Sequence, residues 1–157
     1  RYPAQEKVVR LILERGFQVS ERGRVVSGGI EIPHAQIAKE LDVDRRVVDT
    51  TAASIVEDGD LWKIFKNVRS MTFLADVAPV VGLGVIEITP VDAAQTGLLG
   101  DVASAVARYG LSIRQAVSDD PYFVEQPKLT IITDAKIPGE LVRLLMDVNG
   151  VKRVTVY

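Results

Sequence analysis

Apolar residues near the start of the chain recur with the spacing of an amphipathic helix. Within residues 4–15, five aliphatic side chains lie on one broad side of such a helix: Val8, Val9, Leu11, Ile12 and Leu13. Gly16 follows them as a stop signal. From Phe17 to Ile32, short runs rich in β-branched residues alternate with the glycine-containing turns SERG and SGG. That rhythm predicts a first helix followed by short strands.

Two more helices are predicted between residues 33 and 59. Pro33 suits a first helical position, and an apolar stripe of Ile37, Ala38 and Leu41 follows it. Asp44 is placed to cap the second helix, because an aspartate side chain accepts hydrogen bonds from N–H groups of the first turn. The inward residues of that helix are expected to be Val47, Val48, Thr51, Ala52 and Ile55. Two helices joined by about three residues are typical of a helix-turn-helix. The apolar segment 61–65 is expected to add a wing to it.

Beyond residue 80 the pattern alternates between strand and helix periods. Strands are predicted at residues 80–88, 111–117, 128–133 and 151–157, and helices at residues 97–109 and 139–148. The order βαββαβ is that of the ferredoxin-like fold, an antiparallel sheet with both helices on one face. Gly82 and Gly84 fall inside the first predicted strand, which suggests that another backbone, such as that of a partner subunit, approaches there.

The expected fold class is therefore α+β, with two domains. Residues 1–69 are predicted to form an N-terminal winged helix-turn-helix domain, residues 70–79 a linker, and residues 80–157 a C-terminal ferredoxin-like βαββαβ domain. The boundary is placed where a segment of mixed character ends in proline.

Two segments resemble known families. The segment IAKELDVDRRVV (37–48) resembles the helix-turn-helix of prokaryotic transcription regulators, with Asp42 at the turn position that usually carries glycine. Residues 80–157 resemble an ACT domain, most specifically in the segment TGLLGDVASAVARYGLSI (96–113). An ACT domain that follows a helix-turn-helix is similar to the predicted archaeal regulators of amino-acid metabolism. The resemblance implies a DNA-binding regulator that senses an amino acid.

Candidate DNA contacts lie on the outward face of the second helix of this bihelical segment. The N-terminal part of that helix enters the major groove in helix-turn-helix proteins, so Arg45 and Arg46 are suited to reach guanine edges or phosphates. The candidate set comprises Gln36, Arg45, Arg46, Asp49 and Thr50. Neighbouring carboxylates favour an alternative, a solvated face used for protein contacts.

A candidate ligand site follows from the ACT resemblance, which implies main-chain contacts to an amino acid from Gly97, Leu98 and Leu99. Unpaired N–H groups at a helix N-terminus favour a carboxylate. The candidate set comprises Asp92, Gln95, Thr96, Gly97, Leu98, Leu99 and Ser112. Alternatively, the Thr96 hydroxyl is expected to cap the helix and Gly97 only to permit a tight turn. A further alternative is that the domain binds no ligand and only brings copies of the chain together.

Composition limits the remaining functions. A net charge of −2 excludes a generic basic coat for nucleic acid, so DNA contact requires a local patch. The chain has no cysteine and a single histidine, His34, expected at the surface or at a helix cap. No catalysis, cofactor or metal is expected, and no apolar run approaches the length of a membrane helix. The prediction is a cytoplasmic regulator that forms a homodimer or a higher homo-oligomer. Its expected partners are double-stranded DNA and an amino-acid effector. The alternative is a regulatory subunit that binds an enzyme or another protein instead of DNA.

Overall fold

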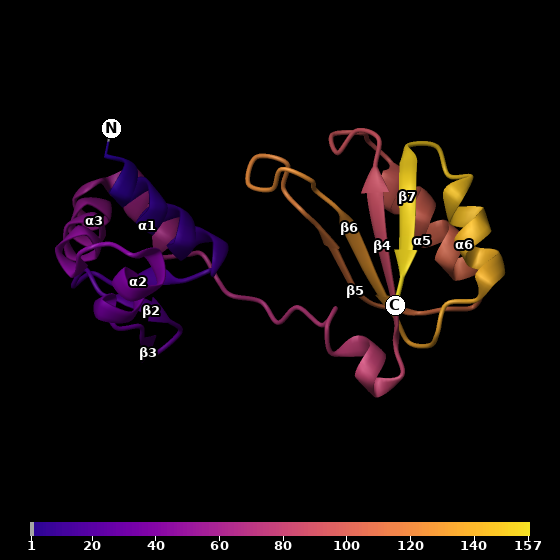
Figure 1. Cartoon of the computed structure of the whole chain (residues 1–157), viewed down its shortest axis with the longest axis horizontal. Helices are drawn as coiled ribbons and strands as arrows, with labels where there is room; N and C mark the ends of the chain where they lie inside the picture. The colour runs from indigo at the N-terminus through magenta and orange to yellow at the C-terminus, as the bar shows by residue number, and fades with distance from the viewer. Residues whose placement is uncertain (1) are drawn as a thin grey trace. The chain divides into compact units, whose positions relative to one another are not determined.

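The computed structural model describes residues 2–157 in two compact units, one ending at Thr72 and the other beginning at Phe73 (Figure 1). The first contains α1 (Pro3–Glu14), β1 (Gln18–Val19), β2 (Val25–Ser27), β3 (Ile30–Glu31), α2 (His34–Leu41), α3 (Arg45–Glu57) and α4 (Gly59–Phe65). The second contains the 3-10 helix η1 (Ala78–Val81), β4 (Gly84–Pro90), α5 (Leu98–Arg108), β5 (Ile113–Ser118), β6 (Leu129–Thr133), α6 (Gly139–Met146) and β7 (Val151–Val156). Within residues 2–157, no helix combines the length and apolar character needed to cross a membrane.

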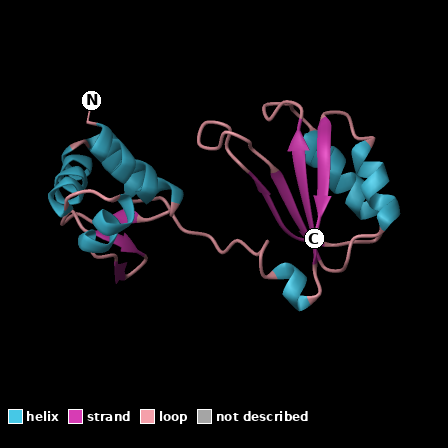
Figure 2. Cartoon of the chain, in the orientation of Figure 1, coloured by secondary structure: helices cyan, strands magenta, loops and turns pink. Residues whose placement is uncertain are grey.

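The apolar stripes of α1, α2 and α3 meet in one core in the first unit. Val8 and Ile12 of α1 pack with Val48 and Ile55 of α3, and each of the four is at most 1% exposed. The inward face predicted for α3 is confirmed. A small antiparallel sheet in the order β1-β2-β3 adds Val25 to this core (Figure 2).

The connection between α2 and α3 has the local chemistry that the sequence predicts. Asp42 ends α2 in the left-handed conformation, with φ 51° and ψ 53°, which aspartate tolerates better than most residues. Asp44 then caps α3 by accepting a hydrogen bond from the Arg46 N–H at 2.7 Å. The turn therefore holds three residues between Leu41 and Arg45.

The expected wing after α3 is wrong, because residues 61–65 belong to helix α4. The Asp58 side chain accepts hydrogen bonds from the N–H groups of Asp60 and Leu61, both at 3.0 Å, and so starts a new helix. Phe65, at the end of that helix, is 2% exposed and completes the core. The small sheet of this unit lies between α1 and α2 along the chain instead.

The second unit has the predicted βαββαβ order. Its four strands pair antiparallel in the order β5-β6-β4-β7, and α5 and α6 lie on one side of them (Figure 1). On that side, Val102 of α5 and Leu141 of α6 pack with Ile86, Ile88 and Ile131 of the sheet. The predicted single-sided layering is confirmed.

The start of the first strand differs from the prediction. Residues 78–81 form η1, and Gly82 ends it with φ 80°, so β4 begins only at Gly84. A Cβ added to Gly84 would lie 2.5 Å from the carbonyl oxygen of Ala135. The backbone that approaches Gly84 therefore belongs to the same chain.

The second face of this sheet carries a smaller apolar cluster. Val85 and Ile132 alternate along their strands with residues that face the helices, so they point to the opposite side. Ala78 is buried against them, and Leu74 and Ala75 pack on the same cluster. Part of the segment expected as a linker thus packs on the sheet.

Candidate nucleic-acid interface and ligand site

The first turn of α3 presents two exposed arginines to solvent. Arg45 and Arg46 begin the helix directly after its Asp44 cap, and both are exposed. Thr50, one turn further on, is also exposed, and so is Gln36 on α2. Four of the five candidate DNA contacts therefore lie on the surface, and three of those four lie on one helix.

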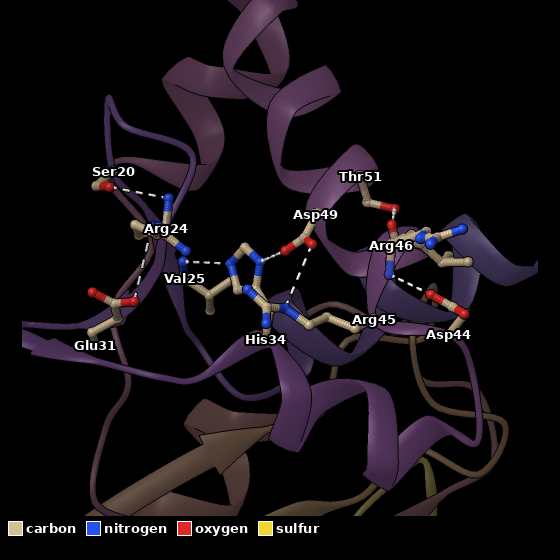
Figure 3. A network of polar contacts seen from close by, with 11 residues as sticks. Ser20, Arg24, Val25, Glu31, His34, Asp44, Arg45, Arg46, Asp49 and Thr51 are labelled. Atoms are coloured by element: carbon tan, nitrogen blue, oxygen red, sulfur yellow. Dashed lines mark hydrogen bonds and ion pairs between the residues drawn. The ribbon is translucent and has the colours of Figure 1, made fainter.

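His34 is buried, so the expectation of a surface or capping role is wrong. Its side chain is 3% exposed. Nε2 accepts a hydrogen bond from the Val25 N–H at 3.3 Å, and Nδ1 lies 2.6 Å from Oδ1 of Asp49 (Figure 3). Because Nε2 accepts, these partners assign the ring proton to Nδ1, which donates to the carboxylate. The histidine thus ties strand β2 to helix α3.

Asp49 is the candidate DNA contact whose two carboxylate oxygens already have partners. Oδ1 accepts from His34, and Oδ2 lies 3.6 Å from Nε of Arg45, one helical turn earlier (Figure 3). The hydrogen bond from His34 lowers the pKa of Asp49, partial burial opposes it, and the positive charge of Arg45 lowers it further. Asp49 therefore stays ionised and is placed to orient the guanidinium of Arg45.

Acid is expected to remove the contribution of Asp49 to the stability of the first unit. Since the folded pKa lies below the usual 3.8, the stabilisation is present above that value and disappears as pH falls through the folded pKa. Asp49→Asn should lower the free energy of unfolding at pH 7 by about 1 kcal/mol, a hydrogen-bond value reduced for solvent screening. The difference from the wild type should shrink as the pH falls below 3.8 and through the folded pKa.

Urea titrations followed by the fluorescence of Trp62, the single tryptophan of the chain, measure this difference. Asp60→Asn, at an aspartate in α4 whose side chain is 92% exposed, is the matched control. A destabilisation by Asp49→Asn that stays constant across the pH range contradicts the assignment.

The N-terminus of α5 is capped by Gly97 rather than by Thr96, so the expected threonine cap is wrong. Gly97 has φ 87° and ψ −16°, and no side chain caps the helix. A Cβ added to Gly97 would meet nothing within 4 Å, so the space beside this backbone is open. The N–H groups of the first turn are therefore available to an anionic group.

Two adjoining hollows lie beside this helix start. The smaller, about 180 Å³, is lined by Gly97, Leu98, Leu99 and Gln95, among others. The larger, about 700 Å³, is lined by residues that include Asp92, Glu125, Lys152 and Arg153. Pro90, Ala93 and Pro127 line both. Only the larger hollow falls within the roughly 300–1,000 Å³ typical of small-molecule sites.

Lys152 and Arg153 are candidate ligand contacts that the sequence patterns did not reveal. Arg153 pairs with Thr89 across β4 and β7, which brings the start of the last strand beside the end of the first. That neighbourhood follows from the βαββαβ order, in which the first and last strands are adjacent and antiparallel. The sequence signal that could have identified them is the pair of adjacent basic residues at the start of the final strand.

The remaining predicted ligand residues are not all brought together. The Gln95 side chain donates to the Asn149 carbonyl at 3.1 Å, and Asp92 accepts from the Ala94 N–H at 2.9 Å. Thr96 lies between Gln95 and Gly97. Ser112 follows the far end of α5, a helix of 11 residues and thus about 16 Å long. Its N–H donates to Asp134 at 2.9 Å.

No known protein family and no curated protein matches the chain. Several solved structures that resemble it are those of transcriptional regulators. An AsnC family transcriptional regulator from Agrobacterium tumefaciens is 10% identical with a TM-score of 0.32, covering 100% of this chain and 88% of that one. The leucine response regulatory protein of Mycobacterium tuberculosis is 11% identical with a TM-score of 0.31, covering 100% and 92%.

Proposed function

We propose that the chain is an amino-acid-responsive, DNA-binding transcription regulator. The observation that carries this proposal is the α2-turn-α3 unit, whose second helix buries Val48 and Ile55 in the core and starts with two exposed arginines. In this assignment residues 1–69 form a helix-turn-helix domain whose small sheet precedes α2, and residues 80–157 form an ACT-like sensor.

In the DNA complex, the first turn of α3 enters the major groove. Arg45 and Arg46 then face base edges, and the fork of an arginine matches the two acceptors of guanine. Thr50 and Gln36 contact the flanking backbone. A homodimer presents two such helices to a palindromic site, with half-sites about 34–36 Å apart.

The effector is a free amino acid held by the second unit. Its carboxylate meets the open N–H groups at the start of α5, and its ammonium group faces Asp92. Lys152 and Arg153 line the neighbouring hollow together with Asp92 and add positive potential there. The effector alters DNA affinity through its preference for one geometry of the dimer, with a typical coupling of about 1–3 kcal/mol.

Salt dependence tests the DNA-binding half of the proposal. The full chain selects a duplex from a random-sequence library, and mobility shifts then measure its affinity for that duplex. Because binding releases counterions from the phosphates, we expect the affinity to fall by roughly 10³-fold between about 50 and 200 mM salt. If the chain instead retains a partner protein and no duplex, and its affinity for that protein is nearly independent of salt, the regulatory-subunit alternative is supported.

A further inference from the structure

A hollow in the first unit lies between α3 and the turn that joins β1 to β2. The turn, residues 20–24, contributes Arg22 and Arg24 to the lining, and α3 contributes Arg45 and Asp49. Residues far apart in the sequence thus share one surface. It lies beside the reading face of α3, the face that carries Arg45 and Arg46 and is proposed to contact the bases. The two elements meet here without an apolar side chain larger than alanine in the lining.

This turn is held firmly against the helix. Gly23 adopts φ 67°, and a Cβ added to it would lie 3.9 Å from the Ala53 nitrogen, so the turn runs directly over α3. The Ser20 hydroxyl and carbonyl accept from the N–H groups of Arg24 and Gly23 at 3.2 and 2.9 Å, which closes the turn. His34 fastens the adjoining strand to α3 (Figure 3). The hollow is therefore preformed.

The charges that line the hollow are predominantly positive. Three arginines face one carboxylate, and that carboxylate, Asp49, is already bound by His34 and Arg45. Arg22 makes no ion pair within residues 2–157. Arg24 has Glu31 as its nearest carboxylate, at 4.0 Å, and both side chains are at least half exposed. The hollow therefore keeps a net positive charge and unpaired guanidinium donors.

We propose that this hollow holds a backbone phosphate of the DNA duplex whose major groove receives α3, an inference that rests on the proposed function. A guanidinium matches the paired oxygens of a phosphate, and Arg22 supplies it from the turn. Arg45, at the shared border of the hollow and the reading face, stays directed at the base edges by Asp49. The β1–β2 turn thus fixes the position of the duplex on the protein, while α3 contacts the base edges.

Arg22→Ala in the full chain tests this site, with the selected duplex and a scrambled duplex of equal length as probes. A phosphate contact carries no sequence information. We therefore expect both affinities to fall by the same factor, about five-fold near physiological salt, and the slope of log affinity against log salt to fall by about one. Arg22→Lys should retain most of the slope, and Arg10→Ala, on α1 outside the hollow, should change neither quantity.

The outcomes separate this inference from the function on which it rests. If Arg22→Ala leaves both affinities and the salt slope unchanged while Arg45→Ala weakens the selected duplex, the phosphate site is overturned and the regulator stands. If Arg22→Ala lowers only the affinity for the selected duplex, the turn reads bases and the phosphate site is again overturned. If the wild-type chain binds no duplex, both proposals fail. Trp62 fluorescence verifies that each variant is folded.

Discussion

Arg45→Ala is expected to lower the affinity for the selected duplex by about 5- to 150-fold, the equivalent of 1–3 kcal/mol for a bidentate contact between arginine and guanine. Arg45 lies in the first turn of α3, its side chain is 61% exposed, and Asp49 holds its Nε at 3.6 Å. That contact leaves the two terminal nitrogens of the guanidinium free to donate to a base edge. Mobility-shift titration with the selected duplex measures the loss.

The scrambled duplex and a second arginine variant make this prediction specific. The affinity for the scrambled duplex should change far less, because phosphate contacts supply most of non-specific binding. Arg10→Ala removes the same charge from an exposed position on α1 and should leave the specific affinity unchanged. Equal affinities of Arg45→Ala and wild type for the selected duplex would show that α3 is not the reading helix.

The parts of the fold that local chemistry determines could be predicted from the sequence. The left-handed Asp42 and the Asp44 cap depend only on neighbouring backbone groups. Helical spacing in α3 and α5 identifies a buried face without knowledge of what covers it. The βαββαβ order followed because strand and helix periods alternate clearly after residue 80.

Among the features that failed, the burial of His34 depends on contacts between distant segments, whereas the segment 61–65 was misassigned from its local pattern. The segment 61–65 is too short for periodicity to separate strand from helix, and the Asp58 cap and the burial of Phe65 decide in favour of α4. His34 is buried because strand β2 supplies an N–H group and α3 supplies a carboxylate. No local sequence pattern predicts either partner.

The candidate sites show the same division. Exposure of Arg45 and Arg46 followed from the helical period, whereas the hollow beside them requires the β1–β2 turn to fold over α3. Likewise, Gly97 is a local feature of a helix start, but Lys152 and Arg153 reach the neighbouring hollow through strand pairing. Each site therefore combines one element that the sequence predicts with one that only the tertiary structure brings to it.

An amino-acid effector is expected to stabilise the chain by about 2.7 kcal/mol when present at 100 times its dissociation constant. Binding to the folded second unit alone shifts the unfolding equilibrium, because the unfolded chain lacks the site. A thermal-shift screen of the full chain with each of the twenty amino acids measures this stabilisation. We expect one chemical class, a zwitterion with a small or apolar side chain, to raise the melting temperature.

Two glycine variants locate the effector. In Gly97→Ala the new methyl group occupies the open space beside the start of α5 and strains a residue with φ 87°, so the unliganded variant should itself be less stable. The ligand should no longer raise the melting temperature above that of the unliganded variant. Gly100→Ala places the same group on the same helix, also with nothing within 4 Å, and should respond as the wild type does. If no amino acid stabilises the wild-type chain, the second unit serves only to pair copies of the regulator. If Gly97→Ala still responds, the carboxylate is held elsewhere, and Lys152 and Arg153 become the residues to replace.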